Sequence, residues 1–378
     1  MEKLCFVTYQ FKTGGVERVF NAIATLLPDY DIVLLSVTNK FDSMIKNVPS
    51  TVKIIPLYNI TYFRFIDSII TNCKLLSPVF YVILLISEII YLRLSSKYAE
   101  YTFVNSADTI STLLVAYFGS HKKNRYSWIH CNPKTIDVSR YSCIYKWIYR
   151  RMHKIVCICK EQKKLLLEVV PGLKADKISV IYNPLDYGKI AELMNEPVPV
   201  DYDYMVMVAR FDFRSKDFYT IIDAYGLISD DIKAKLNLVF VGGGPDENEV
   251  KNYTMTKVYK NNIIFVGMQD NPYKWIKHSK ILVHSSRSEG LPTVLLEAMA
   301  CGTPIIATDC ETGVKEILDN GYCGCMVKVG DTQGMADAIT RMMDSKELRE
   351  EYVRRGYEHL SDFSSDKIIT EVRQLWKD

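Results

Sequence analysis

Two glutamates stand eight positions apart in the stretch SEGLPTVLLEAMACGTPIIAT, which begins at Ser288. Glu289 precedes Gly-Leu-Pro, and Glu297 follows an apolar run typical of a helix. We expect a strand over residues 280–283 and a helix over residues 293–300, because proline is favoured in the first helical turn. The start of this helix would offer free backbone N–H groups to an anion, while the two carboxylates accept hydrogen bonds from hydroxyl groups.

A sugar nucleotide requires an anion-binding site flanked by groups that accept hydrogen bonds from its hydroxyls. This stretch therefore predicts a nucleotide-sugar site. Taken alone, Glu297 is better explained as a solvated carboxylate on a helix surface. Its position beside the loop acid favours a binding role. The residues expected to line the phosphate at this junction are Gly290, Leu291, Pro292 and Thr293.

Two cations follow another predicted strand, over residues 205–209, in the segment ARFDFRSKDF. Arg210 can bind two phosphate oxygens with its guanidinium group, and Lys216 adds a point charge six residues later. This pair suits a diphosphate. Surface salt bridges are the alternative explanation for the same residues.

Glycine turns follow two more predicted strands, at Gly14-Gly15 and at Gly242-Gly243-Gly244. Such turns let the backbone approach a ligand closely, although tight packing of a strand on a helix also requires them. The dinucleotide fingerprint needs a further glycine where Glu247 stands, which argues against NAD.

Short β-branched runs alternate with helical patterns along the whole chain of 378 residues, 48% of which are hydrophobic. We therefore predict an α/β protein with two facing, doubly wound, Rossmann-like parallel sheets and a deep cleft between the domains. The predicted domains are residues 1–184 and 185–360, joined by a linker rich in Pro and acidic residues. Residues 361–378 are expected to form a helix that returns to the first domain.

Basic charge is concentrated in residues 122–164, which hold twelve Lys and Arg against two acidic residues, so this window has net charge +10 and the rest of the chain −7. Interleaved aromatic residues suit a membrane surface or a nucleic-acid groove, and a solvated basic face is the plain alternative. The sequence predicts an amphipathic helix over residues 141–152, which either lies on a membrane surface or packs its apolar face on the sheet, since both give the same periodicity. Its expected apolar face consists of Ile144, Trp147, Ile148 and Met152. Its expected basic flanks consist of Lys146, Arg150 and Arg151.

A second apolar segment, residues 79–86, is opened by Pro78 and closed by Ser87 and Glu88. It is shorter than the ~20 residues of a membrane-spanning helix. A buried helix is the simpler interpretation, and a helix that dips into one face of a bilayer is the alternative.

Together these motifs resemble the family 4 retaining glycosyltransferases of GT-B fold. The resemblance is carried by GG-x-ER near the start, R-x5-K, GGGP and the E-x7-E stretch, and it is closer in the second half of the chain. It extends to bacterial enzymes of capsule, O-antigen and lipid-linked oligosaccharide assembly. It implies a UDP-sugar donor, a glycan or lipid-linked glycan acceptor, and a cytoplasmic enzyme held peripherally on an anionic membrane surface.

The resemblance also assigns roles to residues. It implies that Glu297 binds the ribose, that Glu289 holds the donor sugar, and that Arg210 and Lys216 stabilise the departing diphosphate. The family's cleft histidine corresponds to His130, which an ordinary loop imidazole would also explain. The family usually needs no metal.

Two other interpretations remain open from the residues. A non-hydrolysing sugar-nucleotide epimerase shares this architecture but needs acid and base side chains on both sides of a sugar carbon. A non-catalytic polyanion-binding protein would explain the basic window. The acidic triplet Asp201-Tyr202-Asp203 resembles a manganese motif, but it precedes a predicted strand, so we expect it to belong to the linker.

Overall fold

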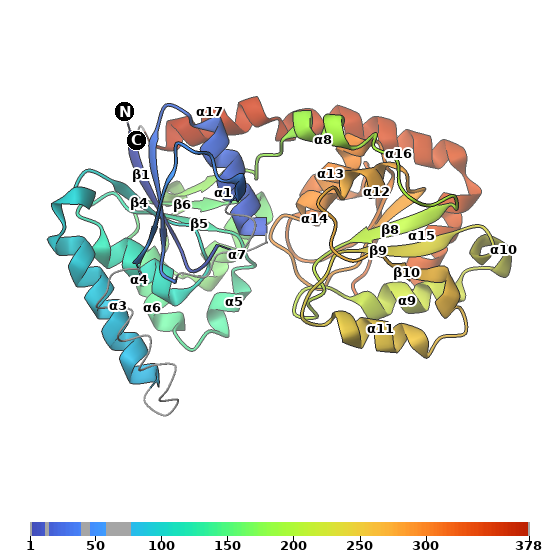
Figure 1. Cartoon of the computed structure of the whole chain (residues 1–378), viewed down its shortest axis with the longest axis horizontal. Helices are drawn as coiled ribbons and strands as arrows, with labels where there is room; N and C mark the ends of the chain where they lie inside the picture. Colours follow the sequence, from blue (N-terminus) through green and yellow to red (C-terminus); the bar gives the residue numbers. More distant parts are fainter. Residues whose placement is uncertain (1, 12–14, 39–45, 58–76, 377–378) are drawn as a thin grey trace. The chain divides into compact units, whose positions relative to one another are not determined.

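The computed structural model describes residues 2–11, 15–38, 46–57 and 77–376 (Figure 1). The chain forms two compact units. Unit 1 comprises Met1–Pro184 and Ile368–Asp378, and unit 2 comprises Leu185–Lys367. Each unit is described by itself below.

Unit 1 is built on a seven-stranded sheet in which every neighbouring pair is parallel, in the order β3-β2-β1-β4-β5-β6-β7. Its central strands are buried along nearly their whole length, as expected when helices cover both faces of a parallel sheet. The strands are β1 (Lys3–Thr8), β2 (Asp31–Ser36), β3 (Lys53–Pro56), β4 (Thr102–Asn105), β5 (Tyr126–Ile129), β6 (Lys154–Cys157) and β7 (Ile178–Val180).

Two helices of unit 1 begin where the sequence supplies a capping side chain. Thr109 accepts a hydrogen bond from the N–H of Thr112 at the start of α4, and the Cys159 sulfur accepts one from Gln162 at the start of α7. These helices are α1 (Gly15–Leu26), α3 (Ser77–Leu94), α4 (Ile110–Gly119), α5 (Lys134–Asp137), α6 (Ser142–Tyr149) and α7 (Lys160–Val169).

The C-terminal helix α17 (Ser365–Leu375) ends within unit 1. Arg373 donates two hydrogen bonds to Asp29, at 2.6 and 2.8 Å, and the ring of Trp376 packs edge-on against Tyr126 with their centroids 4.8 Å apart. The end of the chain is thereby attached to the first unit.

Unit 2 contains a six-stranded parallel sheet in the order β10-β9-β8-β11-β12-β13. Its strands are β8 (Tyr204–Val208), β9 (Asn237–Val241), β10 (Ile263–Phe265), β11 (Ile281–His284), β12 (Ile305–Thr308) and β13 (Cys325–Val327). Its helices are α8 (Tyr187–Leu193), α9 (Phe218–Leu227), α10 (Asp230–Lys233), α11 (Glu247–Met255), α12 (Tyr273–Lys277), α13 (Thr293–Cys301), α14 (Val314–Ile317), α15 (Thr332–Asp344) and α16 (Lys346–His359). Two Rossmann-like parallel-sheet units confirm the α/β fold class predicted from the sequence.

The structure corrects the predicted end of the apolar helix in unit 1. The helix does not stop at Ser87 and Glu88 but continues to Leu94. Ser87 satisfies its hydroxyl within the helix by donating to the carbonyl of Ile83 at 2.8 Å, and Glu88 is completely buried. Within the described part of the chain, no helix is long and apolar enough to cross a membrane.

The predicted apolar face of the second candidate helix is also wrong in part. Ile148 and Met152 are fully buried in the core of unit 1, because the inward face of α6 is centred on Tyr145 and Tyr149. Ile144 and Trp147 remain at the surface.

Candidate active site

The loops that follow β8 and β11 meet at the carboxyl edge of the second sheet, because these strands are neighbours. The N–H of Asp217 donates to the carbonyl of Ser285 at 3.0 Å, and the N–H of Arg287 donates to the carbonyl of Ser215 at 2.7 Å. An isolated antiparallel bridge joins Lys216 to Ser286. These backbone bonds fix the loop after β8 relative to the loop after β11. Ligands of open parallel sheets bind at such loops, beyond the carboxyl ends of the strands.

Glu289 is the centre of a side-chain cluster built on these two loops. Its Oε1 atom accepts hydrogen bonds from the ammonium of Lys216, from the hydroxyl of Ser286 at 2.6 Å, and from Nε2 of His284 at 3.1 Å. The side chains of Lys216 and Glu289 are only 14% and 13% exposed, and His284 is buried. Sequence elements 73 residues apart thus converge on one carboxylate oxygen.

The surroundings within the cluster lower the pKa values of both Glu289 and His284. Burial raises the pKa of Glu289, but the positive charge of Lys216 and the hydrogen bonds from His284 and Lys216 outweigh burial and hold that pKa well below its usual range. Burial and Lys216 together lower the pKa of His284, against the opposing effect of Glu289. At neutral pH the cluster therefore contains a carboxylate, an ammonium and a neutral imidazole.

Arg210 follows β8 directly and has a more open environment. Its side chain is 58% exposed, with Nε 3.9 Å from a carboxylate oxygen of Asp212. Asp212 is bound more closely by Arg214, through hydrogen bonds of 2.9 and 2.5 Å. The guanidinium of Arg210 is therefore held only weakly at the carboxyl edge of the sheet, in a position to bind an anion.

The loop after β12 supports the backbone of the Glu289 loop. Thr308 accepts a hydrogen bond from the N–H of Ser286 at 2.8 Å and donates one to its carbonyl at 2.7 Å, while the Thr312 hydroxyl donates to the carbonyl of Glu289. Gly313 has φ +78°, and a Cβ there would lie 2.7 Å from the carbonyl oxygen of Gly290. Only glycine permits this approach.

Helix α13 begins at Thr293, behind Pro292, and no side chain caps its start. The first N–H groups of a helix have no carbonyl partner inside the helix, and the aligned peptide dipoles make this end attractive to an anion. Leu291 is buried beside it. The predicted phosphate-binding junction therefore lies directly after the Glu289 cluster in the chain.

The three glycines after β9 have a structural reason. A Cβ on Gly242 would lie 2.0 Å from the carbonyl oxygen of Ala209, and one on Gly244 would lie 2.3 Å from that of Phe211. Gly243 accepts a backbone hydrogen bond from Phe211 at 3.1 Å. The glycines bring this loop against the loop that carries Arg210, so their types are explained by packing whether or not they also contact a ligand.

Glu297 does not lie on the helix surface that the sequence suggested. Its side chain is 3% exposed, because α13 packs against β11 and β12 and is also contacted by α8 and α16. A buried carboxylate requires partners. A solvated surface carboxylate is thereby excluded for this residue.

The remaining predicted residues belong to unit 1. Gly14 lies outside the described residues, and Gly15 opens α1 with no described atom within 4 Å of a Cβ built on it. His130 follows β5 and stacks on Trp128, with ring centroids 6.5 Å apart. Burial lowers the pKa of His130, and Asp108, whose carboxylate accepts its backbone N–H at 2.9 Å, opposes that shift.

The basic residues predicted for the acceptor or membrane side have partners near α6. Lys146 pairs with Asp137 at 2.5 Å, and Arg150 donates to the carbonyl of Pro171 at 2.8 Å. Arg151 lies over the ring of Trp147, 4.2 Å from its centroid.

Sequence reasoning missed the side chains that hold Glu289 in place. His284 ends β11, where the sequence shows only a strand, and the short hydroxyl residues Ser286, Thr308 and Thr312 resemble any loop residue. The one available signal was the accumulation of small hydroxyl residues after two neighbouring predicted strands.

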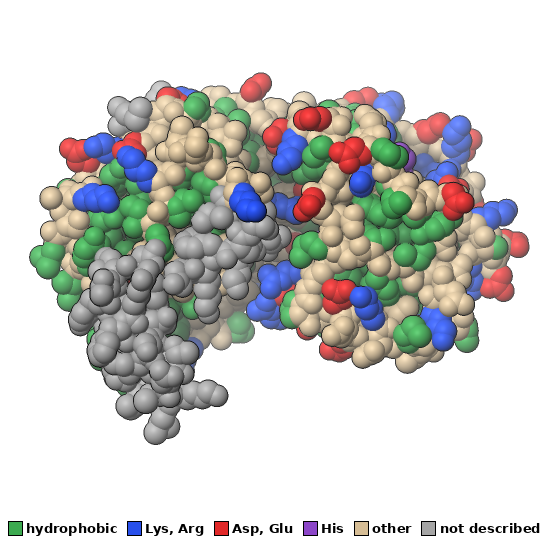
Figure 2. Space-filling model, in the orientation of Figure 1, with side chains coloured by type: hydrophobic (Ala, Val, Ile, Leu, Met, Phe, Trp, Pro, Cys, Tyr) green, Lys and Arg blue, Asp and Glu red, His purple; other side chains and the backbone are tan. Residues whose placement is uncertain are grey.

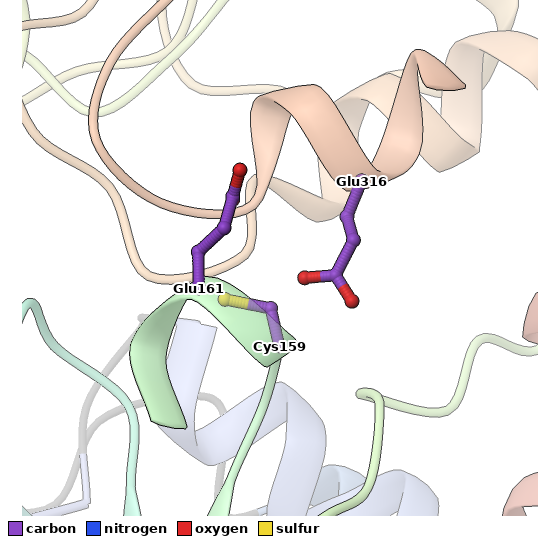
Figure 3. A group of neighbouring side chains, drawn as sticks. All are labelled: Cys159, Glu161 and Glu316. Carbon is purple, nitrogen blue, oxygen red and sulfur yellow. The ribbon is translucent and has the colours of Figure 1, made fainter. Parts of the chain in front are cut away.

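The acidic triplet before β8 lies at the opposite, amino edge of the second sheet. Asp203 pairs there with Lys280, which precedes β11, at 3.1 Å. Figure 3 labels Cys159 and Glu161, which lie at the start of α7 in unit 1. The Cys159 sulfur already caps its helix.

Comparison with known proteins finds that this chain is similar to glycosyltransferases. Residues 191–359 match the family model described as Glycosyl transferases group 1. An uncharacterised glycosyltransferase of Methanocaldococcus jannaschii is 28% identical over 289 residues, covering 66% of this chain and 70% of that protein. The N-acetylgalactosamine-N,N'-diacetylbacillosaminyl-diphospho-undecaprenol 4-alpha-N-acetylgalactosaminyltransferase of Campylobacter jejuni is 24% identical over 386 residues, covering 98% of each chain.

Solved structures show the same architecture. The Anabaena protein Alr3699/HepE in complex with UDP and glucose aligns over the whole of both chains with a TM-score of 0.79 and 15% identity. A glycosyltransferase from Rickettsia africae aligns with a TM-score of 0.76 and 16% identity, covering 100% of this chain and 98% of that one. The fold is GT-B, and the family model matches within unit 2, on residues 191–359.

Proposed function

We propose that this chain is a retaining, family 4 glycosyltransferase that moves a hexose or N-acetylhexosamine from a UDP-sugar to a glycan acceptor. The observation that carries the proposal is the Lys216–Glu289 ion pair next to the uncapped start of α13, at the carboxyl edge of the second sheet. It combines a cation and helix N–H groups for a diphosphate with a carboxylate for sugar hydroxyls.

In this mechanism the enzyme stabilises the leaving group. Negative charge grows on the diphosphate as the sugar–phosphate bond breaks, and Arg210, Lys216 and the start of α13 each interact with it, at ~3–4 kcal/mol for a well-placed donor. Glu289 accepts hydrogen bonds from the donor sugar and Glu297 from the ribose. The acceptor hydroxyl attacks on the face that the diphosphate leaves, and a phosphate oxygen takes its proton, so configuration is retained.

Ser286 and His284 support this role by occupying one oxygen of Glu289. Lys216 neutralises Glu289 before the donor arrives, so binding of a diphosphate gives the ammonium a second anionic partner. His130 is proposed as a catalytic residue on the family resemblance alone.

The acceptor is proposed to be a lipid-linked glycan of cell-surface polysaccharide or oligosaccharide synthesis, used at the inner face of the cell membrane. The name of the Campylobacter jejuni relative describes a diphospho-undecaprenol acceptor, and a Rhizobium meliloti relative, 29% identical over 53% of this chain, is named for lipopolysaccharide core biosynthesis. The basic residues Lys146, Arg150 and Arg151 fit an anionic surface, with ~1 kcal/mol of attraction for each basic residue near it.

No metal cofactor is proposed. The diphosphate has cationic and helix-end partners, and Asp203, the last residue of the acidic triplet, is already paired with Lys280 at the other edge of the sheet. Activity should therefore persist in excess EDTA.

The direct test is incubation of the purified protein with a panel of radiolabelled nucleotide sugars, scoring hydrolysis without acceptor and transfer to membrane lipid extract, with and without EDTA. Transfer from one UDP-sugar with an α-linked product supports the proposal. Interconversion of the sugar nucleotide without UDP release would indicate an epimerase instead. Turnover of no nucleotide sugar, together with steeply salt-dependent binding of DNA or RNA, would indicate a polyanion-binding protein.

A further inference from the structure

The outer face of α3 in unit 1 has an unusual composition for a surface. Six large apolar side chains, between 42% and 81% exposed, project from it at spacings of three and four residues, and we call them the α3 stripe: Val79, Val82, Ile83, Ile86, Ile90 and Leu94. One helical face carries all six, because these spacings return to the same side of a helix. The stripe is ~22 Å long at the rise of an α-helix.

The opposite face of α3 is fixed inside the unit. Leu84, Leu85 and Leu92 are buried, and Leu92 packs near Gly119 at the end of α4. Glu88, on the same inner face, is fully buried, and burial raises its pKa to about 9. The inner face of α3 packs in the core of unit 1, so the exposed α3 stripe is available to contact a partner outside this unit.

The stripe carries no charge from Val79 to Ile90. The carboxyl group of this helix before Arg93 is that of Glu88, which is buried on the inner face, and burial raises its pKa. Ser87 satisfies its hydroxyl on the helix backbone. By contrast, Lys, Arg, Asp and Glu side chains are spread over the surface that Figure 2 draws for unit 2. The outer face of a helix in contact with water normally carries charged and polar side chains, as the surface of unit 2 does.

Basic residues gather at the C-terminal end of the stripe. Arg93 donates to the carbonyl of Ser120 at 2.5 Å, which places the following residues, Lys122 and Lys123, at this end of α3. Lys97 lies in the turn directly after the helix and is exposed. The one acidic residue in this turn, Glu100, is paired with Lys3.

Aromatic side chains extend the same surface. α3 packs on α4 and α4 packs on α6, and Figure 1 shows the three helices side by side. Phe118 of α4 and Trp147 of α6 are both about 40% exposed and stack with their ring centroids 6.3 Å apart. The Arg151 guanidinium lies over the ring of Trp147, 4.2 Å from its centroid.

From these observations we infer that the α3 stripe docks unit 1 on an anionic lipid bilayer. Apolar side chains enter the boundary between headgroups and acyl chains, aromatic rings settle at the headgroup level, and the basic end binds anionic headgroups. A second copy of this chain is the weaker occupant, since a contact between two stripes would leave the basic residues at their ends without an anionic partner. The inference deepens the proposed membrane association, and it replaces α6 by α3 as the inserting element.

The test is flotation of the full-length protein with vesicles of phosphatidylcholine, with and without about one third phosphatidylglycerol. The wild type should float with the anionic vesicles. The double variant Val82→Glu/Ile86→Glu should partition at least ~10-fold less, because it places two charges in an apolar boundary. The matched control Met255→Glu/Val258→Glu, at exposed apolar positions of unit 2, should float like the wild type.

A second measurement reports insertion directly. The single variant Ile90→Trp should show blue-shifted emission with anionic vesicles and quenching by brominated lipid chains. Thermal stabilisation by UDP, measured on each variant, shows that the fold and the donor site survive, so that a failed docking surface and a failed transferase proposal give different results.

Three outcomes overturn the inference. These are a wild type that ignores anionic vesicles, a stripe variant that floats as well as the control, and a wild type that is dimeric without lipid and becomes monomeric in the stripe variant. The last result would assign the stripe to a second copy.

Discussion

Two buried glutamates in this chain show opposite behaviour. Glu289, in the loop after β11 of unit 2, accepts three side-chain hydrogen bonds on one oxygen, and its pKa lies well below the usual range although burial raises it. Glu88, on the inner face of α3 in unit 1, has no side-chain hydrogen-bond partner among the described residues, and burial raises its pKa to about 9.

The difference shows that partners, and not burial, decide the charge of an enclosed carboxyl group. Glu289 stands where two neighbouring strands end, so loops from both can supply donors. Glu88 stands within a helix, and none of the described side chains donates a hydrogen bond to it. An ionised, positioned carboxylate can accept hydrogen bonds from a substrate, whereas a neutral buried one only fills space.

Removing the cation of the first site should have the largest effect. Lys216→Met is expected to lower turnover of the nucleotide sugar by ~100-fold or more, because the diphosphate loses a donor in the transition state. Arg210→Ala should act in the same direction. Lys346→Ala, at a 74% exposed lysine of α16, is the control and should keep near-normal turnover. A loss confined to KM in steady-state kinetics would contradict this assignment.

Glu297→Gln tests the buried carboxylate proposed for the ribose. It should weaken UDP binding by ~10-fold, since a hydrogen bond to a charged group is worth about 1.5 kcal/mol more than none. Calorimetric titration with UDP measures this, with Glu347→Gln on the exposed start of α16 as the control. Unchanged affinity would mean that Glu297 is a structural residue of α13.

Ser286→Ala tests the positioning of Glu289 and should have a smaller effect. It removes one of three bonds to Oε1, so we expect the KM for the donor to rise ~3–10-fold, the worth of one neutral hydrogen bond, with turnover largely kept. Ser288→Ala, two residues along the same loop, should change neither constant. Equal losses in kcat for the Ser286 variant would place its hydroxyl on the reacting groups instead.

The architecture and the donor motifs were accessible to sequence reasoning because they depend on local patterns. β-branched runs alternate with periodic segments, and the helix expected over residues 293–300 is α13, Thr293–Cys301. The R-x5-K and E-x7-E spacings identified Lys216 and Glu289, which the structure brings into contact.

The predictions failed where the result depends on three-dimensional surroundings. Glu297 has the sequence context of a surface carboxylate, and only the packing of other helices around α13 buries it. A pattern with helical period likewise cannot say which face turns inward, so Ile148 and Met152 were assigned to the wrong side of α6. Glu88 was taken as the end of a helix because a charged group rarely lies in a core, and the structure accommodates it by keeping it protonated.

Glu88→Gln sharpens the comparison from the other side, with no effect expected on turnover. A carboxyl whose pKa is near 9 when folded and about 4.5 when unfolded binds a proton in the folded state that the unfolded state lacks, so the free energy of unfolding falls between these pH values, by at most about 1.4 kcal/mol per pH unit. Glutamine is neutral throughout and removes this slope. The difference in melting temperature, variant minus wild type, should therefore grow in favour of the variant as the pH rises from ~5 to ~8.5. Glu100→Gln, at an exposed carboxylate paired with Lys3, is the control and should leave the slope unchanged. Parallel curves for the wild type and Glu88→Gln would show that Glu88 is ionised in the folded protein, and the contrast with Glu289 would then be lost.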